Sequence, residues 1–429
     1  DVDIKKLGIS SSFTKFLTQS EYIYRFFLEI SSEGIDINEI KTKDTYEFYG
    51  EHLAILSEVL KNYKELLDKN LFVDRLNLRD NYRINLEYLE LFEDITIYFE
   101  GYFTKQEFEM ILEISKIKDL KINFFSNIYN QKSLQVFKNM DFEIKLDHIY
   151  TISLSKKEII SEILLEETNK NIEIKGFSSR LNQLSYIKSS IVNCVNLGIN
   201  PNKIAVILPD ESFAATLELF DRENYFNFAM GKTILNKNIY QKSNAIYNYI
   251  LENELKNIEN IKFLDLDFEF IEKEIKHFWN KVCTKERFIQ ITDFLKNLEQ
   301  NLEILEKYDE IVYKLNFVLF SQNFNLKLKD IYKIFLQKLA KISLDDAHSG
   351  KITVMGLLET RLIDFDAIII CDFNNSFIPK ISLKDKFLST KVKYLANLPT
   401  KIDRENLQKY YYKRLIDSSK NIFISYVES

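Results

Sequence analysis

The apolar positions of this chain follow a helical period over its first part. Between Glu51 and Leu67, the residues Leu53, Leu56 and Val59 fall on one stripe, and similar three-to-four-residue spacing runs through 13–27. Such spacing predicts amphipathic helices with one face in a core. We therefore expect residues 1–90 to be helical.

The period then changes to that of short strands separated by helices. Runs rich in β-branched and aromatic residues at 95–99, 120–125 and 148–154 predict strands, and a helix is expected over 104–112. Thr104 and Glu107 have the spacing of a capping box at the start of that helix. This order predicts βα units and a mainly parallel sheet.

A second series of the same kind begins near residue 172. A strand over 173–177 and a helix over 180–197, ended by Gly198, precede the fully apolar run 204–208, which is typical of a strand buried on both faces. Residues 241–345 are charged and helical in pattern, and predict a helical insertion. Strands then resume at 351–355, 367–372 and 422–426. The expected fold is α/β, with a sheet interrupted by a long helical excursion.

Composition narrows the class of protein. Nine glycines and four prolines among 429 residues disfavour turn-dense all-β folds. The net charge of −6 excludes a globally basic nucleic-acid surface but allows a local one. Three widely spaced cysteines, no signal peptide and no apolar run of about 18 residues predict a cytoplasmic protein without a membrane span. The first residue is Asp, and we expect an internal piece of a longer protein.

The usual catalytic patterns are missing from the sequence. Gly231-Lys232-Thr233 ends like a phosphate-binding loop, but Phe226 stands where its first glycine belongs. Glu-Ile-Lys occurs four times without the upstream Asp that a nuclease strand pair would supply, and the four histidines form no zinc motif. We predict no catalytic residue, metal site or cofactor.

One segment has the order of a ligand-binding region. The strand over 351–355 leads into a compact charged turn, the strand over 367–372 follows, and a polar loop ends at Pro379. Ligands of parallel sheets bind beyond the carboxyl ends of strands. The candidate residues at those ends are Glu359, Thr360, Arg361, Asn374 and Asn375. The alternative is a capped turn with an internal Glu359–Arg361 salt bridge.

This segment resembles motif V of UvrD-type helicases. The turn Gly-Leu-Leu-Glu-Thr-Arg at 356–361 is most similar to its version in the AddB subunit of the AddAB (RecB-like) helicase–nuclease family. In the same order, 204–211 resembles the motif IV strand, 227–232 a downstream AddB segment, 97–107 the Walker B region and 404–426 motif VI.

The resemblance implies two RecA-like parallel-sheet lobes with large helical insertions. Its implied domains are a helical 1B-like insertion (1–90), a remnant of the first lobe (91–165), the second lobe in two parts (166–240 and 346–429) and a 2B-like helical insertion (241–345).

Departures from the family pattern imply that the helicase-like part is inactive. The Walker B position reads Phe99-Glu100-Gly101 instead of paired acids, and Pro209 stands where a motor has an arginine. Asp417 occupies the arginine-finger position, with Arg414 three residues away. Without a cradle and a finger together, phosphoryl transfer is not expected. The family's nuclease domain follows motif VI, and we expect this chain to lack it.

What the resemblance then implies is a recombination subunit that binds single-stranded DNA and an AddA-like helicase partner in double-strand-break repair. A basic cluster follows the motif V segment, opposed only by Asp385 and interleaved with Phe387 and Tyr394. Its predicted DNA-contacting members are Lys380, Lys384, Lys386, Lys391 and Lys393. A solvated basic face is the alternative for this cluster. For the whole chain the alternatives are an active ATP-dependent helicase or nuclease, and a purely structural docking subunit.

Overall fold

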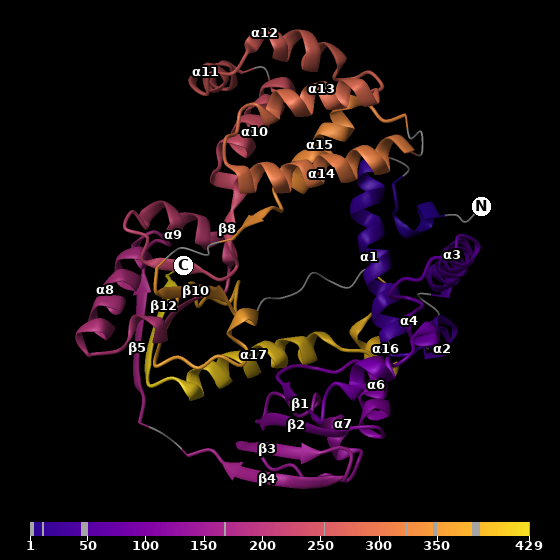
Figure 1. The fold of residues 1–429 in the computed structure, drawn as a ribbon, viewed down its shortest axis with the longest axis vertical. Helices are drawn as coiled ribbons and strands as arrows, with labels where there is room; N and C mark the ends of the chain where they lie inside the picture. Colours follow the sequence, from indigo (N-terminus) through magenta and orange to yellow (C-terminus); the bar gives the residue numbers. More distant parts are fainter. Residues whose placement is uncertain are drawn as a thin grey trace. The chain divides into compact units, whose positions relative to one another are not determined.

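The structure is a computed structural model that describes residues 4–10, 13–43, 50–166, 169–252, 254–321, 325–345, 350–379 and 387–428 (Figure 1). The chain forms two compact units. The first comprises Asp1–Arg180 and Thr360–Ser429, and the second comprises Leu181–Glu359. The fold is mixed α/β with parallel strands, as the sequence predicts. None of the described helices is long and apolar enough to cross a membrane.

Helices open the first unit, in agreement with the periodicity of residues 1–90. They are α1 (Phe13–Ser32), α2 (Ile37–Lys43), α3 (Gly50–Lys69) and the short α4 (Leu78–Asn81) and α5 (Leu86–Glu90). Leu53 and Leu56 of the predicted stripe are buried with Phe26 and Phe27 of α1. The same core takes Leu398 from beyond the helix α16 (Thr390–Leu395), so distant parts of the chain share one interior.

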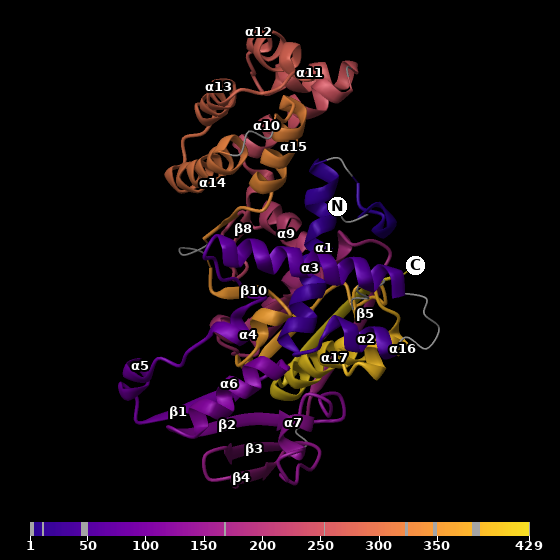
Figure 2. The ribbon, with the colours of Figure 1, turned by 90° about the vertical axis from the view of Figure 1, so that its right-hand side faces the viewer.

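A four-stranded sheet follows, in the order β1 (Asp94–Phe99), β2 (Asp119–Ser126), β3 (His148–Ser153) and β4 (Glu158–Leu164). Helix α6 (Lys105–Ser115) lies along β1 and β2 (Figure 2) and begins with the predicted Thr104–Glu107 capping box. Phe124, Phe137 and Tyr150 are central in the core beneath these strands.

The expectation of a mainly parallel arrangement is wrong for part of this sheet. Strands β1 and β2 are parallel, but β3 is antiparallel to β2, and the unpredicted β4 is antiparallel to β3. A parallel crossover usually needs a full helix, whereas only the one-turn α7 (Gln135–Lys138) lies between β2 and β3. After β3, a tight connection leads directly into β4, so these two strands form a hairpin. Lys157 in this connection adopts the left-handed region at φ 55°.

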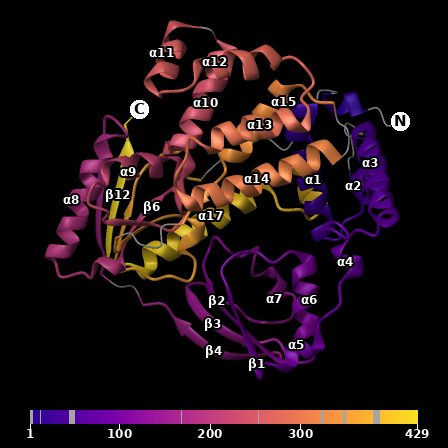
Figure 3. The same ribbon diagram turned by 45° about the horizontal axis from the view of Figure 1, so that its top comes forward.

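The first unit also holds three parallel strands in the order β5 (Asn171–Phe177), β12 (Asn421–Val427) and β11 (Ala367–Ile370). Helix α17 (Lys401–Ser418) precedes β12 and carries Tyr410, Tyr411 and Leu415 into the interior. Figure 3 shows this helix reaching toward α1.

The second unit has its own parallel strands and a group of helices. Strands β6 (Ile204–Leu208), β10 (Ile352–Gly356) and β7 (Phe226–Phe228) are parallel in that order, and β6 is fully buried. Helix α8 (Asn182–Asn196) ends before Gly198, which adopts φ 84°. Helix α9 (Ala214–Phe220) follows β6 in the chain and packs near β8 (Lys232–Thr233).

Residues 241–345 are mostly helical, as predicted. The main helices are α10 (Asn238–Leu251), α11 (Leu255–Phe263), α13 (Lys285–Lys296), α14 (Leu302–Ser321) and α15 (Leu328–Leu339), which pack on one another (Figure 1). The two-residue strands β8 (Lys232–Thr233) and β9 (Ser343–Leu344) pair at the entry and exit of this region. The identification of these parts as RecA-like lobes and insertions, and the domain boundaries implied for them, stay predictions.

Candidate functional site

Glu100, directly after β1, and Arg414, on α17, form the centre of a polar network in the first unit. The Arg414 Nε lies 2.5 Å from Glu100 Oε1, and the two side chains are only 13% and 10% exposed. A charge pair withdrawn from water in this way holds its geometry because separating it would leave an uncompensated buried charge.

The turn that follows Thr360 completes this network. Arg414 Nη1 donates to the carbonyl oxygens of Thr360 and Ile363, each at 3.2 Å, and the Leu362 N–H donates to Glu100 Oε2 at 3.1 Å. Leu362 adopts a left-handed φ of 63°, which turns its N–H in this sharp bend. The structure thus joins three segments that the sequence singles out separately: the Walker B-like position, the motif V-like turn and the motif VI-like helix.

A cavity of about 720 Å³ adjoins the Glu100–Arg414 pair. Its walls come from the face of the β1–β3 strands that is turned away from α6, from the 362–364 turn and from the end of α17. Tyr98 and Ile149 are exposed there, at 61% and 39%. Glu100 and Arg414 contact each other within this wall, and Asp364 Oδ1 lies 3.4 Å from Arg414 Nη2. The pair therefore uses most of its hydrogen-bonding capacity inside the protein.

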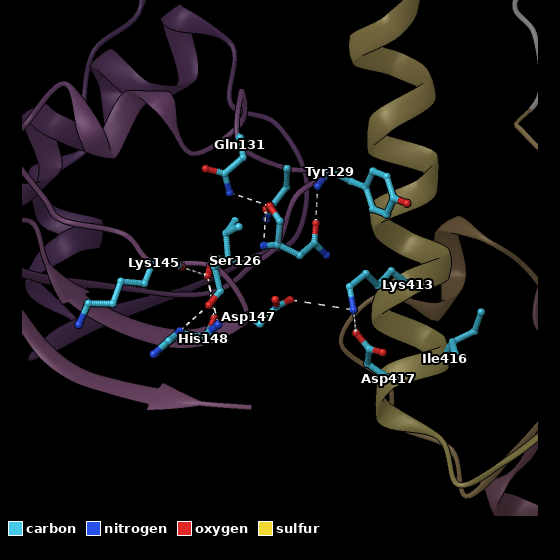
Figure 4. Close-up of polar contacts among 12 residues, drawn as sticks. Ser126, Tyr129, Gln131, Lys145, Asp147, His148, Lys413, Ile416 and Asp417 are labelled. Carbon is cyan, nitrogen blue, oxygen red and sulfur yellow. Dashed lines mark hydrogen bonds and ion pairs between the residues drawn. The ribbon is translucent and has the colours of Figure 1, made fainter. Parts of the chain in front are cut away.

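Further along α17, the helix is tied to the β2–β3 region. Lys413 Nζ lies 2.6 Å from Asp417 Oδ2 on the same helix and 4.0 Å from Asp147 Oδ1 (Figure 4). Ser126 Oγ, at the end of β2, donates to the Lys145 carbonyl at 2.5 Å. These contacts fix the loop after β2 against the helix.

The predicted residues of the motif V-like turn differ in their surroundings. Glu359 belongs to the second unit, is exposed, and has its carboxylate 2.7 Å from where a Cβ on Gly356 would lie. Thr360 is buried, with its carbonyl oxygen bonded by Arg414. Arg361 is exposed, and its guanidinium lies 6.0 Å from the centre of the Tyr411 ring. Of the three, Arg361 presents a cation at the surface.

A second polar group gathers at the carboxyl ends of β5, β11 and β12. Arg180 contacts Asp372 Oδ2 through both Nε and Nη2 at 2.7 Å, and Asp372 is almost fully buried with φ 52°. The Asn374 amide donates to the Val427 carbonyl at 2.7 Å and accepts from the Val427 N–H at 3.0 Å. Asn374 thus extends the edge of β12, whereas Asn375 is exposed.

The predicted lysines are placed only in part. Lys380, Lys384 and Lys386 lie outside the described residues. Lys391 is exposed on α16, but Lys393 is buried, with its ammonium 2.9 Å from Glu29 of α1. Glu29 also pairs with Arg404 of α17 at 2.8 Å. Contact of Lys393 with a nucleic acid would require this internal pair to open.

The described residues provide neither a cluster of metal ligands nor an activated thiol at the two cysteines Cys194 and Cys283. In the described part of the chain, no group of three or more histidine, cysteine, aspartate or glutamate side chains could hold a metal ion. Burial raises the pKa of the Cys194 and Cys283 thiols to about 11, which keeps both protonated and unreactive at neutral pH.

Sequence reasoning noted Glu100 and Arg414 only as departures from the helicase pattern, and it missed their pairing. For Glu100, the available signal in the sequence was a single acidic residue directly after a predicted strand. No signal connected it with an arginine on a distant helix, because nothing in local spacing encodes that contact.

Comparison with known proteins identifies a relative at low sequence identity. No protein-family model matches the chain. An uncharacterized protein of Rickettsia bellii (strain RML369-C) is 22% identical over 461 residues, covering 99% of this chain and 50% of that protein. The chain thus spans about half the length of the curated relative that it matches. The relative's name states no activity, so it adds none to this chain.

Proposed function

We propose that this chain is the inactivated, helicase-like part of an AddB/RecB-type recombination subunit. In this proposal it binds single-stranded DNA and a motor partner during double-strand-break repair. The motif resemblance in the sequence suggests the family. The observation that supports an inactive role is the pairing of Glu100 with Arg414 at 2.5 Å.

The pairing disfavours nucleotide hydrolysis for a simple reason. A motor needs carboxylates that hold Mg²⁺ and an arginine that reaches the transferred phosphoryl group. Here the one acid of the Walker B-like position accepts from Arg414 and from the Leu362 N–H. The same arginine donates to two backbone carbonyl oxygens. Neither group is available for a metal or a phosphate without breaking a buried ion pair.

DNA binding is proposed to rest on exposed cations and amides. Arg361, beside the Tyr411 ring, together with Asn375 and Lys391, offers groups that contact phosphates and stack on bases. The net charge of −6 requires that such binding be local.

Fluorescence anisotropy with a labelled single-stranded oligonucleotide, repeated over a salt series, tests the binding. We expect affinity to fall with salt, with a log–log slope of about −0.7 for each phosphate contacted. Affinity that does not change with salt would contradict the proposal. Binding of a helicase subunit with no affinity for DNA would instead favour the structural docking role.

An ATPase assay with and without the same oligonucleotide tests the inactive role. We expect no phosphate release above that of a protein-free blank. Sustained turnover, or metal-dependent cleavage of DNA, would establish the active alternative.

A further inference from the structure

A cavity of about 790 Å³ in the first unit is separate from the Glu100–Arg414 site. Its walls come from α1, from the loops that follow β1 and β2, and from the start of α17. Aromatic rings supply much of the wall: Tyr22, Phe26, Tyr102, Tyr129 and Phe387. Phe26 and Phe387 pack with ring centres 5.3 Å apart, so this part of the wall is rigid and apolar.

The position of the cavity is one where α/β proteins bind ligands. Strands β1 and β2 are parallel, and both end at the cavity. Tyr102 follows β1, and Tyr129 and Ser133 follow β2. Crevices beyond the carboxyl ends of parallel strands are the usual ligand sites of such sheets, and the volume lies in the range of about 300–1,000 Å³ found for small-molecule sites.

The charged groups around the cavity already have partners within the protein. Lys132 pairs with Asp403 at 3.0 Å, and Arg404 pairs with Glu29 at 2.8 Å. The Tyr102 hydroxyl donates to Glu33 at 3.0 Å. Arg25, which also lines the cavity, pairs with Glu21. Since each of these cations already has a carboxylate partner and Glu33 already accepts from a hydroxyl, the wall favours an uncharged ligand over a phosphate or an amine.

The remaining polar groups suit the edge of a flat, uncharged molecule. Among the described residues, nothing hydrogen-bonds the Asn406 amide or the hydroxyls of Ser32 and Ser133, and all three line the cavity. An amide supplies both donors and an acceptor, and hydroxyls supply either. Aromatic walls favour stacking with a planar ring.

We propose that this cavity binds an uncharged planar heteroaromatic ring of the nucleobase type, with the Asn406 amide on its polar edge. The ring can belong to a free nucleoside or to one base of a single strand. The second source rests on the proposed function, whereas the first does not.

The experiment has one arm for each source. In the first arm, adenosine, guanosine, cytidine and thymidine are titrated into the full chain and followed by ligand-observed NMR. In the second, affinities are compared for an intact single-stranded oligonucleotide and for the same strand with one abasic residue at successive positions. We expect at least one nucleoside to saturate, or at least one position to lose about tenfold in affinity when its base is removed.

Asn406→Leu is the matched variant, since it keeps the side-chain size and removes the hydrogen bonds. We expect it to weaken nucleoside binding about tenfold, or to abolish the abasic effect. Asn193→Leu, at an exposed position of α8, is the control and should change neither. Unaltered binding by a folded Asn406→Leu variant would overturn the assignment of the site.

The outcomes separate this inference from the proposed function. Salt-dependent DNA binding without nucleoside saturation or any abasic effect overturns the base pocket and leaves the proposed function standing. Nucleoside saturation without DNA affinity supports the pocket and contradicts the proposed function. Because both arms use the unmodified protein, they decide the matter even when a variant fails to fold.

Discussion

Glu100 and Arg414 are far apart in the sequence, yet they form an ion pair in which both side chains are largely shielded from water. Breaking a buried pair by removing one partner is costly, because the other charge stays in a poor solvent. We expect Arg414→Met to lower the free energy of unfolding by about 3 kcal/mol. Urea denaturation measures this, and Glu100→Gln combined with Arg414→Met should recover part of the loss.

The matched comparison for that pair is Lys61–Glu65 on α3. These groups are 3.9 Å apart and more than 60% exposed. Surface pairs of this kind contribute about 0.5 kcal/mol or less. Equal losses for Arg414→Met and Lys61→Met would show that the Glu100–Arg414 pair is screened by water like any surface pair.

Glu33 allows a prediction about pH. Burial raises the pKa of this carboxyl above its ordinary value of 4.5, although hydrogen bonds from Tyr102 and from the Lys105 backbone oppose the shift. The folded state therefore binds the proton more tightly than the unfolded chain. The stabilising contribution of the protonated Glu33 carboxyl is complete below pH 4.5, and it is lost as the pH rises through the folded-state pKa of this group.

Glu33→Gln, which stays neutral at every pH, should accordingly gain stability relative to the wild type as the pH rises from 4.5 to 7. Thermal unfolding of both proteins across this range measures the difference. A difference that is constant with pH would mean that the pKa of Glu33 is the same in the folded and the unfolded protein.

Single residues also show where sequence reasoning ends. Lys393 belongs to a run of lysines that reads as a basic surface, but it is buried against Glu29. Asn374 reads as a ligand-contacting amide, but it bonds both backbone groups of Val427. Composition and spacing place such residues near a strand end or on a helix, whereas their partners come from parts of the chain that only folding brings close.

At the scale of elements, strong periodicity made most of the secondary structure predictable. The apolar run of β6 and the Thr104–Glu107 capping box appear as expected, because each is encoded within a few neighbouring residues. Strand β4 was missed because it lies at a sheet edge with nearly all of its residues exposed, so it lacks the alternation that marks a half-buried strand. The direction of β3 depends on its connection, which local pattern does not encode.

Helix α17 shows how one element organises the first unit. Its residues contact α1 through Arg404, the end of β1 through Arg414, and β2 through Tyr410, whose ring lies 6.2 Å from that of Phe125. Leu415 is fully buried on this helix, and Ile402 is 61% exposed. We expect Leu415→Ala to lower the free energy of unfolding by about 2–5 kcal/mol.

Ile402→Ala is the control in the same helix. It removes an exposed side chain and improves helix propensity, so we expect a change of within about 0.5 kcal/mol. Urea denaturation of both variants gives the comparison. Similar effects at the two positions would mean that α17 does not pack on the unit through its Leu415 face.

At the scale of the whole molecule, the question is how a chain of net charge −6 could hold a polyanion. Either the electrostatic field of the whole chain controls the binding of a nucleic acid, or a local cluster of cations controls it. Lys384→Glu with Lys391→Glu reverses two charges in the predicted basic cluster. Lys256→Glu with Lys262→Glu reverses two exposed charges on α11. Each reversal subtracts two charges, so both double variants go from −6 to −10.

Because the two variants have the same net charge, any difference between them reports on location alone. We expect the Lys384/Lys391 variant to lose about tenfold in affinity for every single-stranded sequence, and its salt slope to become shallower as phosphate contacts are lost. The Lys256/Lys262 variant should keep the slope of the wild type. Equal losses in both variants would show that overall charge, and not a local channel, controls binding. Anisotropy at several salt concentrations distinguishes these cases, since only lost contacts change the slope.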